Sequence, residues 1–300
     1  MTALAAGAGS AMSRRMRLVL RTLILPIALA AMAGGVFATG KVRPALARPP
    51  QRIVSLNLCA DQLVLRLADR SQIAGLTRNA TDREMSAEAV RARGLRLLSK
   101  SAEEIVALDP DLIVGMPARR SAAIKVLEDQ NYRMVDLKPA EQYDQILSSI
   151  RSTAAVVGHS DRGEVLIAQM DRELAGIPRL GRGRVAAYYQ RRGFMTGTGT
   201  LIDEVMARAG LVNLATKLGK PALSQVSLEE MVAARPDFLI VESATDVVRD
   251  QGTEMLHHPA LAGIPRISIP QAWTVCGSPA YVRAVRGIAE QIARHDRGRR

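Results

Sequence analysis

The feature that most constrains the fold is an eleven-residue segment that occurs twice, 126 positions apart. Residues 101–111 read SAEEIVALDPD and residues 227–237 read SLEEMVAARPD, and the two are identical at seven positions. In each copy a Ser can cap a short helix, a Glu three residues later can close a capping box, and Pro-Asp ends the helix. An uninterrupted apolar run follows, at 112–114 and at 238–241. Such runs are typical of parallel strands covered by helices on both faces, so the repeat predicts two similar α/β units.

Further strand and helix patterns alternate around each copy. We expect strands at 53–56, 73–76, 112–115, 133–136, 185–189, 238–242 and 266–269, and helices at 61–68, 122–130, 201–209 and 281–294. Between the halves, residues 160–175 form a long helical pattern with Ser160 as its N-cap and no strand beside it. The predicted fold class is α/β, with two doubly wound lobes joined by one long helix and a ligand cleft between the lobes, where strands end and loops begin. We place the lobes at 48–158 and 181–300 and the linking helix at 159–180.

The first 47 residues have the character of an export signal. A basic run at 14–17 precedes an apolar stretch, and small residues suited to cleavage end at Ala38 or at Ala47. The basic run also loosely resembles a twin-arginine signal, which leaves the export route open. An uncleaved membrane anchor is the alternative, although Arg21 interrupts the span. We expect a cleaved signal at 1–47 and a location in the periplasm.

The nominal net charge of +12 lies mainly at the two ends of the chain. The first 47 residues hold six of the 41 basic residues and no acidic one, which leaves 35 basic residues against 29 acidic residues. Four more arginines crowd residues 294–300, a tail that we expect to be solvated. We therefore expect no nucleic-acid partner.

Sequence signatures of enzymes are absent. There is no Walker A sequence, zinc-peptidase His pair or nucleophile elbow, and Gly197-Thr198-Gly199 lacks the third glycine of a dinucleotide fingerprint. The four histidines lack the spacing that would bind a bare metal ion. We expect no catalytic residue, no metal ligand and no cofactor. A cell-envelope enzyme and a structural envelope protein are the alternatives from other classes.

Loops after the predicted strands carry arginines and most of the aromatic residues, although aromatics make up only 3% of the chain. Guanidinium groups pair well with carboxylates, and aromatic faces suit a large flat ligand. The candidate ligand-binding residues are Asn57, Cys59, Arg78, Arg119, Tyr189, Arg191, Trp273 and Cys276. Together they favour a bulky ligand with anionic character.

Over residues 51–295 the sequence resembles the periplasmic binding proteins of ABC importers for ferric siderophores, haem and cobalamin. The most specific matches are RIVSL at 52–56, EEIVALDPDLI at 103–113 and QVSLE at 225–229. Also similar are the TGTGT turn at 196–200 and a Trp, here Trp273, shortly before Ser-Pro.

The resemblance implies that each lobe presents a glutamate to arginines of a membrane permease. By motif these are Glu103 and Glu229; the capping boxes would occupy Glu104 and Glu230 and leave the first glutamate of each pair free. Two exposed carboxylates favoured by the helix dipole alone are the alternative explanation. The implied partners of this protein, which we expect to be monomeric, are an ABC permease dimer in the inner membrane and a small-molecule metal chelate.

The cargo that the resemblance implies contains iron or cobalt. Because of the arginines we favour an iron-siderophore complex or haem, with cobalamin as the alternative, and the tryptophan near the ligand would be Trp273. Cys59 and Cys276 depart from the family pattern, and we expect them to face each other from opposite lobes. They are free buried thiols, a disulfide that would restrict opening of the lobes, or ligands to a metal in the cargo.

Overall fold

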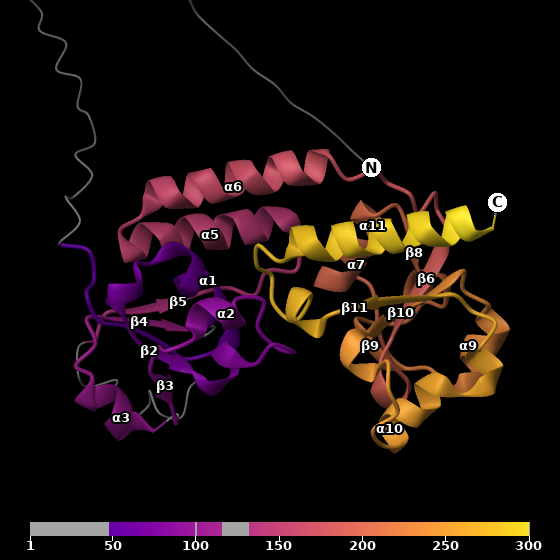
Figure 1. The fold of residues 1–300 in the computed structure, drawn as a ribbon, viewed down its shortest axis with the longest axis horizontal. Helices are drawn as coiled ribbons and strands as arrows, with labels where there is room; N and C mark the ends of the chain where they lie inside the picture. The colour runs from indigo at the N-terminus through magenta and orange to yellow at the C-terminus, as the bar shows by residue number, and fades with distance from the viewer. Residues whose placement is uncertain (1–47, 100, 116–131, 300) are drawn as a thin grey trace, which may run out of the picture. The chain divides into compact units, whose positions relative to one another are not determined.

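The computed structural model describes residues 48–99, 101–115 and 132–299 (Figure 1). Within it, Leu46–Arg300 form one compact unit that contains both sheets. The expected signal at 1–47 and the expected helix at 122–130 lie outside the described residues.

The first sheet is fully parallel and has the strand order β3-β2-β1-β4-β5. Its strands are β1 (Ile53–Ser55), β2 (Ile73–Thr77), β3 (Leu97–Leu98), β4 (Leu112–Gly115) and β5 (Met134–Asp136). Successive side chains point to opposite faces, so Ile53 packs into one hydrophobic cluster and Val54 into another. Both faces are therefore buried, as the apolar runs predict.

The helices of this N-terminal lobe cover both faces of its sheet. They are α1 (Leu58–Leu67), α2 (Ala89–Ala92), α3 (Ala102–Ala107) and α5 (Tyr143–Val157). The helix α1 begins three residues earlier than predicted, because the Asn57 side chain accepts a hydrogen bond from the Ala60 amide at 3.0 Å and caps it. The prediction missed α5 altogether.

The second sheet is mixed, with the order β11-β10-β6-β7-β9 and β8 also paired with β6. Its strands are β6 (Val185–Tyr189), β7 (Phe194–Thr196), β8 (Val212–Asn213), β9 (Leu223–Gln225), β10 (Phe238–Glu242) and β11 (Arg266–Ile269). The two-lobed α/β fold is confirmed, but β7 runs antiparallel to both of its neighbours. The short strands β7, β8 and β9 were not predicted, because two or three residues carry no recognisable apolar run.

The helices of the C-terminal lobe also cover both faces of its sheet. They are α7 (Leu201–Arg208), α8 (Leu214–Lys217), α9 (Leu228–Ala234), α10 (Gln251–Glu254) and α11 (Tyr281–Gly298). Phe238 of β10 packs into the cluster that contains Val285 of α11, whereas Leu239 packs into the cluster that contains Met231 of α9.

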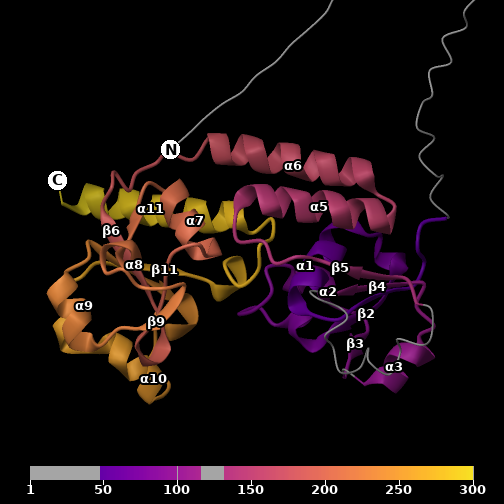
Figure 2. The ribbon, with the colours of Figure 1, turned by 180° about the vertical axis from the view of Figure 1, so that it is seen from behind.

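The linking helix α6 (Ser160–Ala175) has the predicted bounds, although its N-cap is His159 and not Ser160. It packs against α5 and α11, and α5 and α6 lie side by side in both views (Figures 1 and 2). Its buried residues Leu166 and Met170 belong to the same continuous hydrophobic cluster as Ile53 of the first sheet and Phe238 of the second. The helix thus belongs to a core that both lobes share.

Candidate functional site

Both copies of the repeat form the same local structure. The hydroxyl oxygen of Ser101 accepts a hydrogen bond from the Glu104 amide at 3.1 Å, and that of Ser227 accepts one from the Glu230 amide at 3.1 Å. Each copy then reaches a left-handed residue before its proline, Asp109 with φ 44° and Arg235 with φ 45°.

The aspartate that ends each copy holds the first strand of its lobe. The Asp111 carboxylate accepts hydrogen bonds from the amides of Gln51 and Arg52, at 2.7 and 2.8 Å. Likewise the Asp237 carboxylate accepts one from the amide of Val185 at 2.7 Å, where β6 begins. The Pro-Asp pair therefore ends a helix and anchors a neighbouring strand.

The expected capping boxes close only in part. Glu104 does not return to Ser101; its carboxylate accepts hydrogen bonds from the amide and hydroxyl of Ser99, both at 2.6 Å. Glu230 forms an ion pair with Lys220 at 2.8 Å. The second glutamate of each pair is thus occupied, but by partners other than its cap.

The first glutamate of each pair is exposed to solvent. The backbone amide of Glu103 and the hydroxyl of Ser101 hold the pKa of the Glu103 carboxyl below its usual value. The pKa of Glu229 is lowered in the same way, by its own amide and by Ser227, with His258 adding a smaller effect. Both carboxylates are therefore negatively charged at neutral pH.

A cavity of about 470 Å³ lies where the two lobes meet. Residues 139–141 and Cys59 contribute from the N-terminal lobe. The C-terminal lobe contributes the ends of β6 and β10, the start of α7, Gln271 and residues 274–277. Its principal polar lining residues are Glu141, Tyr188, Gln190, Glu242, Gln271 and Thr274. None of the described residues that line it is Arg or Lys. The arginines expected to line the cleft are thus not among its described lining residues, and Arg119 lies outside the described residues.

The polar groups on the C-terminal wall of the cavity form one hydrogen-bonded network. Tyr188 donates its hydroxyl to Glu242 at 3.2 Å, and the Gln190 amide donates to the same oxygen at 3.1 Å. Thr196 in turn donates to Gln190 at 2.9 Å. Burial, together with the nearby Glu242 charge, raises the pKa of Tyr188, so its hydroxyl stays protonated and remains a donor.

Glu141 connects the two lobes at the edge of the cavity. Its carboxylate accepts a hydrogen bond from the backbone amide of Leu201, the first residue of α7, at 2.6 Å. An acidic group at a helix N-terminus satisfies a free amide and interacts favourably with the helix dipole. A carboxylate of the N-terminal lobe therefore caps a helix of the C-terminal lobe.

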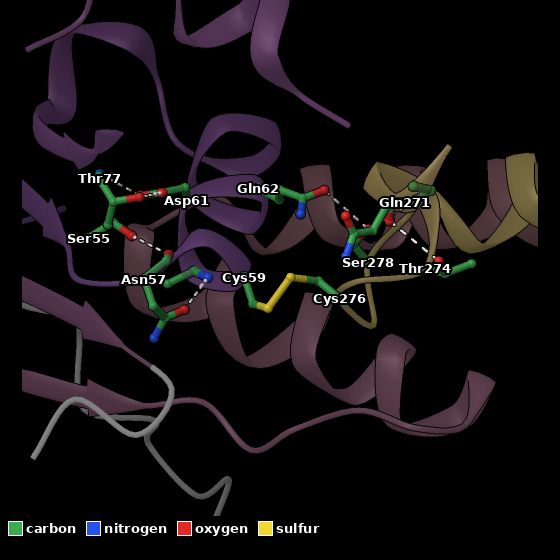
Figure 3. The surroundings of a disulfide bond; sticks show 12 residues. Ser55, Asn57, Cys59, Asp61, Gln62, Thr77, Gln271, Thr274, Cys276 and Ser278 are labelled. Carbon is green, nitrogen blue, oxygen red and sulfur yellow. Dashed lines mark hydrogen bonds between the residues drawn. A yellow bond between two sulfur atoms is a disulfide. The ribbon is translucent and has the colours of Figure 1, made fainter. Parts of the chain in front are cut away.

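Cys59 and Cys276 form a disulfide that links the lobes across 217 residues of sequence (Figure 3). Cys59 lies in the first turn of α1, and Cys276 lies in the loop between β11 and α11. Both line the cavity. Of the three alternatives left open by the sequence, the structure shows the disulfide.

A carboxyl group is buried in the first turn of α1, which also carries Cys59. Asp61 is fully buried, and its carboxylate accepts hydrogen bonds from the amide and hydroxyl of Thr77 (Figure 3). Burial raises the pKa of Asp61 to about 6, although these hydrogen bonds oppose the shift.

The other predicted ligand-binding residues lie apart from the cavity lining. Arg78 is exposed in a 3-10 turn after β2, and Arg191 is paired with Asp250 at the surface. Trp273 packs against Gly287 of α11 and the shared core. Arg119 lies outside the described residues, and Asn57 caps α1.

Tyr189 was predicted one residue out of register. It is completely buried in the second core of the C-terminal lobe, where its hydroxyl donates to the Val226 carbonyl at 2.9 Å. Strand alternation sends the neighbouring Tyr188 to the cavity instead. Glu242 also lines the cavity but was not among the predicted site residues. Its position, as a carboxylate at the end of an apolar strand, could have indicated this.

Neither a metal site nor a membrane span is found in the described part of the chain. No three or more His, Cys, Asp or Glu side chains gather in a way that could hold a metal ion among those residues. Within the same ranges no helix combines the length and apolarity that crossing a bilayer requires.

Comparison with known proteins agrees with this architecture. A cobalamin-binding protein of Halobacterium salinarum is 24% identical over 203 residues, which are 66% of this chain and 55% of that protein. The match therefore spans about half the length of that relative. An uncharacterized ABC transporter substrate-binding lipoprotein of Bacillus subtilis, YvrC, is 21% identical over 220 residues, 69% of this chain and 67% of that protein.

Solved structures share the fold as well. The apo form of the periplasmic haem-binding protein RhuT of Roseiflexus sp. superposes with a TM-score of 0.65 at 25% identity, over 81% of this chain and 97% of that one. Each of these relatives is named as a binding protein. Residues 53–267 match the family described as periplasmic binding protein, and the chain belongs to that family.

Proposed function

We propose that this chain is the solute-binding component of an ABC importer and that its cargo is a corrinoid of the cobalamin type. The observation that carries the choice of cargo is the chemistry of the cavity, whose described lining holds two carboxylates, amides and hydroxyls and no Arg or Lys. This reverses the preference for an iron-siderophore complex or haem, which depended on arginines that lie elsewhere or outside the described residues.

The charge of the lining discriminates between these cargoes. Haem carries two propionates and many siderophores carry anionic groups, which Glu141 and Glu242 would repel in a partly desolvated site. A corrin ring instead carries neutral amides at its edge. Such amides can donate to Glu242 and exchange hydrogen bonds with side chains such as Gln271 and Thr274. The cobalamin-binding relative supports the same choice.

The cargo is tested by titrating the protein lacking residues 1–47 with cyanocobalamin, haemin and a ferric hydroxamate. Isothermal calorimetry gives the affinities, and fluorescence of Trp273, the only tryptophan, reports on the adjacent cavity loop. We expect cyanocobalamin to bind at least tenfold more tightly than the other two. Preferential binding of haemin or the hydroxamate would overturn the corrinoid assignment, and no binding to any of the three would overturn the proposed function.

A charge-removing variant makes the test sharper. Glu242→Gln keeps an oxygen that can accept from Tyr188 and Gln190 but lacks the charge, so we expect corrinoid affinity to fall by about tenfold. An anionic cargo would instead bind more tightly to this variant. Asp250→Asn, which alters a surface carboxylate paired with Arg191, is the matched control and should bind as the wild type does.

Delivery of the cargo follows from the exposed ends of the repeats. We propose that a cleaved signal at 1–47 exports the chain to the periplasm, where the monomer docks on the permease dimer through Glu103 and Glu229. Their exposure and lowered pKa values support this role, since charges at the edge of an interface steer and orient association more than they add affinity.

A further inference from the structure

The disulfide is a second covalent connection between the lobes. The polypeptide passes between the two sheets through α6, and Cys59–Cys276 joins them again at the cavity. Figure 3 shows it between α1 on one side and the loop that carries Gln271 and Thr274 on the other. The cavity-facing end of α1 is thereby tied to residues that line the opposite wall.

Close packing surrounds the disulfide. Gly277, the residue after Cys276, lies so near the N-terminal lobe that an added Cβ would come within 2.1 Å of the Ala140 carbonyl oxygen. The adjacent Glu141 caps Leu201 of α7, as described above. Buried Ser278 faces Gln62 of α1, with its hydroxyl 3.5 Å from the Gln62 side-chain oxygen (Figure 3). The lobes therefore meet at this point without space for a side chain.

Noncovalent contacts also hold the two lobes together away from the cavity. The rings of Tyr143 in α5 and Tyr281 in α11 stack with their centroids 5.2 Å apart. Arg283 of α11 pairs at 3.2 Å with Glu88, a buried carboxylate at the start of α2. These contacts continue the shared core, so the two lobes are in contact from the disulfide at the cavity to α11.

We propose that the disulfide positions the two walls of the cavity by holding the lobes near the spacing that the cargo requires. This inference rests on the proposed binding function. A protein whose binding-competent state is only partly populated binds more weakly in proportion to that fraction. Cross-linking the walls removes wider conformers before the cargo arrives and so lowers the cost of ordering the site. The bond acts through the spacing of the lobes and not as a contact with the cargo.

The test compares wild type, Cys59→Ser with Cys276→Ser, and Gly277→Ala. Spin labels are placed through noncanonical amino acids at exposed Arg83 and Val247, one on each lobe, and their distance is measured by pulsed electron resonance. Labelling that uses no cysteine leaves the disulfide intact. We expect a narrow distance distribution in wild type and a broader one with a longer mean in the double-serine variant.

Affinity should follow the distribution. We expect the double-serine variant to bind cyanocobalamin about tenfold more weakly and saturating cobalamin to narrow its distribution again. Gly277→Ala retains the disulfide but forces residues 276–278 away from Ala140, so it should also lengthen the distance and weaken binding. Wild type treated with a phosphine should match the double-serine variant, since the phosphine takes up oxygen from water as the disulfide becomes two thiols.

Separate results would overturn the inference. An unchanged distance distribution in the folded double-serine variant or the reduced wild type would do so, even if affinity fell, because the disulfide would then act only as a contact. A broader distribution with unchanged affinity would equally exclude the positioning role. If the serine variant does not fold, the reduced protein and Gly277→Ala carry the same test. The distance measurement needs no cargo, so failure of the proposed function would be recognised separately, by the absence of binding in wild type.

Discussion

The copy of the repeat at α3–β4 and the copy at α9–β10 share a backbone but differ in what surrounds it. Ser101 and Ser227 make the same 3.1 Å cap, and Asp109 and Arg235 take the same left-handed conformation. Around this common frame Glu104 binds Ser99, 5 residues away, whereas Glu230 pairs with Lys220.

The exposed glutamates differ in their neighbours too. Glu229 lies at the edge of a hollow that is also lined by Leu228, Val232 and His258. Groups within a few residues of one another therefore form the same caps and left-handed turns in both copies. The surface presented to a partner depends on segments that the repeat does not contain.

Removing both exposed glutamates should have the largest effect. We expect Glu103→Ala with Glu229→Ala to abolish cargo uptake by cells, because the docking charges of both lobes are lost. Cargo affinity measured by calorimetry should stay at the wild-type value. The single variants then reveal whether the two lobes contribute equally. Asp161→Ala, at an exposed position of α6, is the control, and a loss of cargo affinity in the double variant would contradict the docking role.

A second prediction concerns the buried carboxyl group of Asp61 in α1. The raised pKa of Asp61, about 6 against 3.8, means that the folded protein keeps this proton over a range in which the unfolded chain has lost it. Stability therefore falls as pH rises through that range. Relative to Asp61→Asn, we expect wild type to lose about 2 kcal/mol between pH 4.5 and 7.5, measured by urea unfolding. A parallel pH dependence in the two proteins would contradict the shifted pKa, and Asp161→Asn should follow wild type.

The serine caps of the two copies should contribute equally to the free energy of unfolding. Ser101→Ala and Ser227→Ala each remove a side-chain acceptor from a helix N-terminus, and we expect each to lower the free energy of unfolding by about 1 kcal/mol. Ser→Thr at the same positions keeps the acceptor and should restore most of the loss. A clear inequality between the two alanine variants would show that the surroundings, and not the local frame, determine cap strength.

The smallest effect concerns the left-handed residue of each copy. We expect Arg235→Gly to stabilise the protein by about 0.5 kcal/mol, because glycine adopts the positive φ without steric cost. Asp109→Gly should gain less, since it also removes the 2.8 Å ion pair with Arg52. Thermal unfolding measures both, with Arg235→Ala as a control that should show no gain. An equal gain at the two positions would mean that the Arg52 pair contributes nothing.

Elements with a strong local pattern could be predicted, whereas side-chain directions at the site could not. The bounds of β4, β6, β10, β11 and α6 were predicted correctly from apolar runs and capping residues. The predicted cleft residues lie away from the cavity where the direction of the side chain depends on the pleat of a strand or on a partner distant in the sequence. Tyr189 faces the core because β6 enters the sheet in one register, and Arg191 is held by Asp250, 59 residues away.

Caps, Pro-Asp stops and apolar periodicity act over a few residues, so the repeated α/β structure and its linking helix follow from the local sequence. Which groups meet between the lobes depends instead on the tertiary structure. Cys59 and Cys276 are 217 residues apart, and Glu141 reaches Leu201 across 60. Such contacts depend on how two sheets pack on a shared core, and no local pattern encodes that packing.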